Sequence, residues 1–209
     1  MKHLLGYAAV IYDANCIVYQ SFSIVEHDML GLPVRLESPN TTRAKQVTRA
    51  LVNNKKGIST IRRAFEEAEK ILVGKALISL IEEGTIHRQL RIKGKLDPML
   101  KFRITKNLRT ELSQIKQQKW FVISAFFADP TRLEQVRALY REFCLSPELS
   151  KRIPGGKGDP SDVDISLLLF SADSKHPLLT NDEELYNFDS ELRAKGFCEC
   201  VRAFRSVKV

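Results

Sequence analysis

The sequence predicts an α/β fold built around an open, mainly parallel sheet. Three short apolar stretches have the pattern of buried strands: YAAVIYDAN, WFVISAFF and HPLLTNDEEL. They are separated by longer stretches in which apolar residues recur at helical spacing. Strands that alternate with helices favour a parallel sheet, because parallel neighbours need a crossover between them. At 209 residues the chain has the size of one domain, or of one domain with an insertion.

The first half of the chain begins with a predicted strand and continues as helices. In order, the sequence predicts a strand over 5–12 and helices over 14–30, 38–54, 57–72 and 71–84, with the turn signal GLP at 31–33. The 57–72 helix contains ISTIRRAFEEAEK, and the helix after it ends at Gly84.

The second half contains clearer start and stop signals. KFRITKNLRTELSQIK is expected to be helical and WFVISAFF to be a central strand. Asp129 and Pro130 indicate the cap and first turn of the next helix. A loop over 146–162, a helix starting near Asp162, a strand ending before Asp182 and a C-terminal edge strand complete the prediction.

Carboxylates occur where these elements begin or end. Asp13 follows the first strand, Asp182 follows the strand HPLLT, and Asp162 and Asp164 lie in the first turn of a helix. In an open parallel sheet the ligand crevice lies outside the carboxyl ends of the strands. We therefore expect these carboxylates to converge on one edge of the sheet.

Such a cluster favours a divalent cation. Carboxylates without a basic partner repel one another, so a bound cation makes the cluster tolerable. Oxygen ligands without Cys or His suit Mg²⁺ or Mn²⁺ rather than zinc. A metal site of this kind activates water for phosphodiester hydrolysis.

Each acid also has a purely structural interpretation. Asp182 could cap a helix, as could Thr180 or Asn181. Asp162 and Asp164 would favourably oppose the dipole of their helix, and Asp13 could be a turn residue. The metal-site hypothesis depends on the conjunction of the acids, not on any one of them.

DANCIVY after a hydrophobic strand, SDVDISLLLFSA at a helix start and PLLTND at a strand end resemble, in this order, the three conserved blocks of PIN-domain ribonucleases. This family includes VapC-type toxins and nucleases that process ribosomal RNA. The resemblance implies a three-layer α/β/α sandwich, three or four acids that hold Mg²⁺ or Mn²⁺, and cleavage of RNA to a 5′-phosphate and a 3′-hydroxyl. The stretch 75–118 finds no counterpart in the family and is interpreted as a basic helical insertion into a single 1–209 domain.

The resemblance also implies roles for individual residues. Asp13, Asp164 and Asp182 match the metal-site acids, and Asp162 would be an accessory acid. The remaining acid of the family lies on a helix between the first two blocks, where Glu66 is the expected position and Glu67 the neighbouring alternative. Three polar residues would support the acids: Asn15, Thr180 and Asn181.

Positive charge is concentrated in one segment. The whole chain has a net charge of +8, and residues 86–119 alone carry ten Lys or Arg against two acids, which is the same excess. A polyanion such as RNA is the expected partner; the alternative is a solvated basic surface. The expected RNA-binding residues are Arg88, Arg91, Lys93, Lys95, Lys101, Arg103, Lys106 and Arg109.

The remaining features bear on compartment and partners. No apolar run is long enough to cross a membrane, and the four cysteines show no paired spacing, which favours free thiols in the cytoplasm over a zinc site at Cys198 and Cys200. An antitoxin or another protein partner and a homodimer both stay open.

Three functions compete at this point. The leading prediction is a metal-dependent endoribonuclease. The first alternative is an RNA-binding protein that kept the fold and lost cleavage. The second is a phosphatase of the haloacid dehalogenase type, which would need a carboxylate two residues after Asp13, where the sequence has Asn15.

Overall fold

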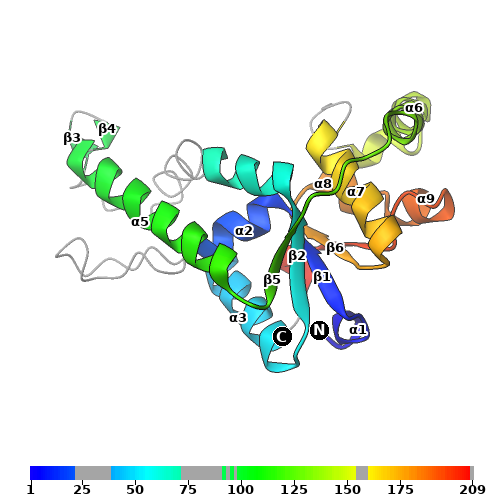
Figure 1. Cartoon of the computed structure of the whole chain (residues 1–209). Helices are drawn as coiled ribbons and strands as arrows, with labels where there is room; N and C mark the ends of the chain where they lie inside the picture. The colour runs from blue at the N-terminus through cyan, green and yellow to red at the C-terminus, as the bar shows by residue number, and fades with distance from the viewer. Residues whose placement is uncertain (22–38, 72–90, 93–94, 97, 154–159, 208–209) are drawn as a thin grey trace.

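The computed structural model describes residues 1–21, 39–71, 91–92, 95–96, 98–153 and 160–207 (Figure 1). Its centre is a five-stranded parallel sheet in the order β5-β2-β1-β6-β7. The strands are β1 (Ala9–Tyr12), β2 (Gly57–Ile61), β5 (Phe121–Ser124), β6 (Leu178–Thr180) and β7 (Val201–Ala203). The predicted α/β class with a parallel sheet is confirmed.

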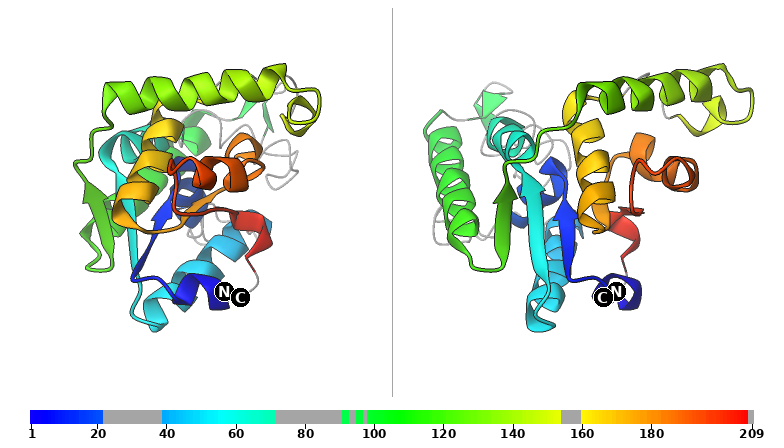
Figure 2. Two further views of the ribbon diagram at one scale, coloured as in Figure 1. Left: turned by 90° about the vertical axis from the view of Figure 1, so that its right-hand side faces the viewer. Right: turned by 45° about the vertical axis from the view of Figure 1, so that its right-hand side comes forward.

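Helices cover both faces of this sheet, which gives three layers (Figure 2). Side chains alternate across β1, so Val10 and Tyr12 join the core on one face while Ile11 joins the core on the other. The first core is closed by α2 (Ala14–Ser21), α3 (Pro39–Asn53) and α5 (Pro98–Gln117). The second is closed by α6 (Pro130–Leu145), α7 (Asp162–Ser174), α8 (Glu183–Tyr186) and α9 (Asp189–Ala194).

Short elements complete the described structure. Before the sheet lies α1 (Lys2–Leu5), so the strand predicted over 5–12 begins only at Ala9. A two-stranded antiparallel ribbon, β3 (Arg91–Ile92) and β4 (Lys95–Leu96), precedes α5. The 3₁₀ turns are η4 (Ser150–Arg152) and η6 (Phe204–Ser206).

The predicted helix over 57–72 is wrong in its first turn. Residues Gly57–Ile61 form β2, and a helix follows over 62–71. β2 pairs with β1 on one side and β5 on the other, and its last four residues are buried. β-Branched Ile58, Thr60 and Ile61 pack well on a pleated surface, which explains why a strand replaces the expected helical turn.

The prediction that WFVISAFF forms a central strand is also wrong. β5 lies at the edge of the sheet and pairs only with β2 among the described strands. Val122 on this strand is accordingly 56% exposed. β2, which the sequence pattern did not reveal, takes the inner position between β5 and β1.

Other predicted elements are confirmed. Asp129 caps α6 by accepting a hydrogen bond from the Arg132 backbone N–H, with Pro130 in the first turn. The helices α3, α5 and α7 and the edge strand β7 lie where they are expected. The predictions for 22–38, 72–90 and 154–159 lie outside the described residues. None of the described helices has the length and apolar character that a membrane crossing requires.

The strand order determines where a ligand crevice can lie. From β1 the chain continues to β2 and β5 on one side of the sheet, and then to β6 and β7 on the other. The order therefore reverses between β1 and β6, and in such sheets ligands bind outside the carboxyl ends of the two strands that flank the reversal. Asp13 directly follows β1, and Asp182 lies two residues after β6.

Candidate active site

Asp13 is the buried centre of the site. Its side chain is 3% exposed and accepts a hydrogen bond of 2.8 Å from Thr180 Oγ1 at the end of β6. Asn15 Nδ2 donates a second, longer one at 3.4 Å. The Asp13 backbone N–H donates to the Leu179 carbonyl, so the pairing of β1 with β6 continues up to the carboxylate. The predicted supporting residues Asn15 and Thr180 thus both contact Asp13.

Asp182 is joined to Asp13 through Thr180. The Asp182 backbone N–H donates to Thr180 Oγ1 at 2.9 Å, and the same hydroxyl donates to Asp13. The Asp182 carboxylate caps α8 by accepting from the Glu184 backbone N–H at 3.1 Å. Both interpretations of Asp182 from the sequence therefore apply at once, because it is a helix cap and a neighbour of the buried acid. Asn181 instead accepts from the Arg205 backbone N–H.

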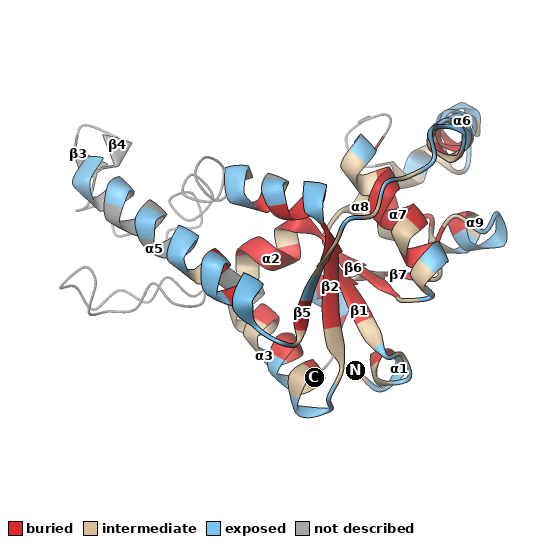
Figure 3. Ribbon diagram, in the orientation of Figure 1, coloured by how far each residue is buried: buried red, intermediate tan, exposed pale blue. Residues whose placement is uncertain are grey.

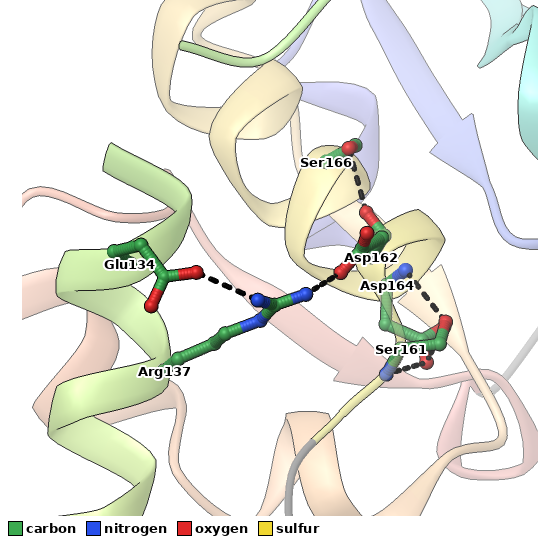
Figure 4. Close-up of polar contacts among 6 residues, drawn as sticks. All are labelled: Glu134, Arg137, Ser161, Asp162, Asp164 and Ser166. Atoms are coloured by element: carbon green, nitrogen blue, oxygen red, sulfur yellow. Dashed lines mark hydrogen bonds and ion pairs between the residues drawn. The ribbon is translucent and has the colours of Figure 1, made fainter. Parts of the chain in front are cut away.

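Asp164 comes to the site from the start of α7. Ser161 and Asp164 form a capping box, in which each side chain accepts from the backbone N–H of the other residue (Figure 4). Ser161 Oγ also donates to Asp164 Oδ2 at 2.7 Å. The box holds the carboxylate at the first turn of α7, and Figure 2 shows this end of α7 beneath α6.

The pKa values of Asp13 and Asp164 are both raised. Burial and, after it, the charges of Asp164 and Asp182 together raise the pKa of Asp13 to about 7, against hydrogen bonds from Thr180 and the Ala14 backbone. Burial and the charge of Asp182 raise the pKa of Asp164 to about 6, against the hydrogen bonds from Ser161. The carboxylates are therefore close enough to interact, and their charge is incompletely compensated within the described structure.

Of the two glutamates considered for the fourth acid, Glu67 is the one whose charge acts on Asp164. Glu66 is exposed, whereas Glu67 is half-buried and its charge raises the pKa of Asp164. The helix over 62–71 buries Ala64, Phe65 and Ala68, and at 100° per residue Glu67 flanks this face while Glu66 lies nearly opposite it. These observations favour Glu67, the neighbouring alternative, over the expected Glu66.

Asp162 turns away from the other acids. Its carboxylate forms an ion pair with Arg137 of α6, which also binds Glu134 (Figure 4). Asp162 and Asp164 are two residues apart on a helix and so project about 200° apart. The expectation that Asp162 contributes to the metal site is therefore not met in this arrangement; its role in the structure is to join α7 to α6.

Tyr140 is a residue that the sequence patterns did not single out. It is buried on α6, and its hydroxyl donates to the Glu184 carbonyl at 2.9 Å. Burial, followed by the charges of Asp182 and Asp164, holds the pKa of Tyr140 well above its usual range. The hydrogen bond from Tyr140 holds the start of α8 next to the acids. The signal available in the sequence was an aromatic residue on the apolar face of the helix predicted over 129–143.

The basic residues expected to bind RNA are only partly described. Lys106 and Arg109 lie exposed on α5. The side chains of the other six lie outside the described part of the structure: Arg88, Arg91, Lys93, Lys95, Lys101 and Arg103.

The acids fit Mg²⁺ or Mn²⁺ by their chemistry. Asp13, Asp164, Asp182 and Glu67 supply only carboxylate oxygens. The raised pKa values of Asp13 and Asp164 reflect burial first and neighbouring negative charge second, and a cation would compensate that charge. Within the described residues, no three His, Cys, Asp or Glu side chains have the arrangement of a formed metal site. Asp164 and Asp182 are instead engaged in helix caps, so an ion would compete with those hydrogen bonds.

Comparisons with protein-family models, with curated proteins and with solved structures found no match to this chain.

Proposed function

We propose that this protein is a metal-dependent endoribonuclease of PIN type. The observation that carries the proposal is the juxtaposition of Asp13, Asp164, Asp182 and Glu67 at the point where the strand order of a parallel sheet reverses. The raised pKa values support it, because strongly perturbed carboxylates at such a position are characteristic of functional sites.

Each acid has a distinct part in this proposal. Asp13 and Asp182 would hold Mg²⁺ or Mn²⁺, and Asp164 would complete the ligand set from α7. When bound, the ion supplies an activated water and stabilises negative charge on a phosphate oxygen. Glu67, whose charge acts on Asp164, would orient the water. Thr180 keeps Asp13 and Asp182 in register through its two hydrogen bonds.

RNA is the proposed substrate because of the charge distribution. An acidic centre repels a phosphate backbone unless positive charge nearby attracts it. The segment 86–119 carries as much excess positive charge as the whole chain. As part of the same proposal we place the protein in the cytoplasm, a reducing compartment in which its four free cysteines would persist. An antitoxin or another protein could regulate the site.

The test is cleavage of an end-labelled single-stranded RNA with and without Mn²⁺. We expect cleavage with Mn²⁺, none with EDTA, and products that carry a 5′-phosphate. Asp13→Asn and Asp182→Asn should abolish cleavage, with a melting temperature that holds or rises because carboxylate repulsion is relieved. Asp173→Asn, which changes an exposed acid at the far end of α7, is the matched control.

Three outcomes would count against the proposal. Undiminished cleavage in EDTA would exclude metal dependence, and full activity in Asp13→Asn would exclude the site. Tight RNA binding with no cleavage in any divalent metal would favour the alternative of an RNA-binding protein that retains the fold.

A further inference from the structure

Exposed residues recur along the described part of α5 (Figure 3). They include both apolar and basic side chains. Met99 and Phe102 are 62% and 63% exposed, which is unusual for such large apolar side chains. Lys106, Arg109, Thr110 and Ser113 are exposed further along the same helix. We call these six residues the α5 face.

The spacing of these residues places them on one side of the helix. At 100° per residue, positions 99, 102, 106, 109, 110 and 113 fall within an arc of about 100°. Leu112 and Ile115 lie outside this arc and are buried against the domain. The helix is therefore anchored by its C-terminal half and presents the α5 face to solvent.

The α5 face is hollowed. An open pocket of ≈ 320 Å³ is lined by Phe102, Lys106, Arg109, Thr110 and Ser113. This volume lies at the lower end of the range for small-ligand pockets, roughly 300–1,000 Å³. A flat group the size of a nucleobase could lie against the Phe102 ring with its charged neighbours within reach.

The chemistry of the pocket favours an anion that carries a flat apolar group. Neither Lys106 nor Arg109 has an acidic partner among the described residues, and Glu111 lies on another side of the helix. Thr110 and Ser113 donate their hydroxyl protons to the carbonyls of Lys106 and Arg109, so the positive charges dominate the pocket.

We infer that the α5 face binds an unpaired segment of RNA, with a base stacked on Phe102 and backbone phosphates at Lys106 and Arg109. This inference rests on the proposed function, because it names the form of RNA that the enzyme would take. Binding of single strands typically combines cationic side chains along the backbone with aromatic rings under the bases. In a duplex the base faces are stacked on each other, so Phe102 would have no partner.

The experiment measures binding without cleavage. The full-length protein in EDTA is titrated into three fluorescein-labelled oligonucleotides of equal length: single-stranded oligo(U), the same backbone with central abasic positions, and an RNA duplex. We expect Phe102→Ala to weaken binding of oligo(U) about five-fold or more, as removal of one stacked base does. The abasic strand and the duplex should be bound equally by both proteins, and Phe102→Trp should restore oligo(U) binding.

Lys106 and Arg109 should affect binding differently from Phe102. Lys106→Gln with Arg109→Gln should weaken binding of all single strands, base-bearing or abasic. The slope of log affinity against log salt should fall by about 0.7 for each phosphate that the variant no longer neutralises. Lys195→Gln, an exposed lysine at the end of α9 on the other side of the sheet, is the matched control.

Circular dichroism must first show that the exposed-face variants fold as the wild type does. Equal losses for oligo(U) and the abasic strand in Phe102→Ala would overturn stacking. Unchanged affinity and salt slope in the double variant would overturn binding at the α5 face, and would leave it as a surface for a protein partner. Neither result depends on metal or cleavage. RNA binding at the α5 face can therefore be disproved while the nuclease proposal stands, and the nuclease proposal can be disproved while RNA binding at the α5 face stands.

Discussion

Thr180 Oγ1 donates a hydrogen bond of 2.8 Å to Asp13 Oδ2, across the junction of β6 and β1. The Thr180 side chain is fully buried, so water cannot replace this bond if it is removed. The same oxygen accepts the Asp182 backbone N–H, and one hydroxyl therefore connects two of the proposed metal ligands.

Replacing this hydroxyl should cost both stability and metal binding. Thr180→Val is nearly isosteric but leaves the Asp13 carboxylate without its shortest hydrogen bond and the Asp182 N–H without an acceptor, for which we expect a loss of about 1–3 kcal/mol in unfolding free energy. Thr180→Ser keeps the hydroxyl and should lose far less. Urea unfolding and Mn²⁺ titration of both variants provide the measurement. Equal unfolding free energies and equal Mn²⁺ affinities in Thr180→Val and Thr180→Ser would show that the hydroxyl has no such role.

Glu67 and Glu66 offer a test with an internal control. Glu67→Gln should lower the rate of RNA cleavage, because the charge of Glu67 acts on Asp164, whereas the exposed Glu66 can be replaced by Gln with a rate near wild type. General-base or water-orienting groups typically contribute about 10²–10⁴-fold to a rate. Single-turnover cleavage at saturating Mn²⁺ separates this effect from metal affinity. A larger loss in Glu66→Gln would return the assignment to the position expected from the sequence alone.

The two acids in the first turn of α7 should also differ in their effect on Mn²⁺ binding. Asp164→Asn should weaken Mn²⁺ binding strongly, since it removes a charge from the cluster. Asp162→Asn removes an exposed ion pair with Arg137 and should change stability by less than about 1 kcal/mol, with little effect on Mn²⁺. Isothermal titration calorimetry compares the two. Similar metal affinities in both variants would contradict the placement of Asp164 among the ligands.

The raised pKa of Asp13 predicts the pH dependence of stability in metal-free protein. Below about pH 4 the carboxyl is protonated in both the folded and the unfolded chain. Between its unfolded value of 3.8 and its folded value of about 7, the unfolded chain releases the proton while the folded protein retains it. Unfolding free energy should therefore fall by about 2–4 kcal/mol as pH rises through this interval. Asp164, whose pKa is raised to about 6, acts in the same direction.

Bound Mn²⁺ should oppose this loss of stability with rising pH. Mn²⁺ competes with the proton for Asp13, so the stabilisation by Mn²⁺ should increase from pH 6 to pH 8. Asp13→Asn should remove much of both pH effects. Unfolding midpoints in urea at pH 5, 6.5 and 8, with and without Mn²⁺, test both predicted directions: the fall in stability without metal and the growing stabilisation by Mn²⁺. If unfolding free energy in Asp13→Asn depends on pH as it does in the wild type, the pH dependence belongs to other groups.

The features that could be predicted from the sequence are those with local causes. Asp129 and Pro130 mark the start of α6, Ser161 marks the start of α7, and apolar runs mark β1 and β6, because caps and strand ends depend on neighbouring residues. The inner position of β2 depends on pairing with β1 and β5, which lie far from it in sequence. No pattern in the local sequence indicates that β2 pairs with β1 and β5.

The choice between Glu66 and Glu67 was open for a related reason. The resemblance indicated the helix but not its rotation, and neighbouring residues on a helix point about 100° apart. The pairing of Asp162 with Arg137 was equally hidden, since it depends on how α6 crosses α7. Positions of acids along the chain were therefore easier to predict than the directions in which their side chains point.

Asp13 and Thr180 are 167 positions apart in the sequence, although their side chains touch. A ribosome adds about 5–20 residues per second, so roughly 8–30 s separate the synthesis of these two residues. Throughout that interval the nascent chain holds Asp13 without Thr180 or Asp182, while it remains attached to a machine made largely of RNA. The pairing of β1 with β6 thus delays assembly of the acid cluster until synthesis has passed β6, so the site of the proposed nuclease stays incomplete while most of the chain is being made.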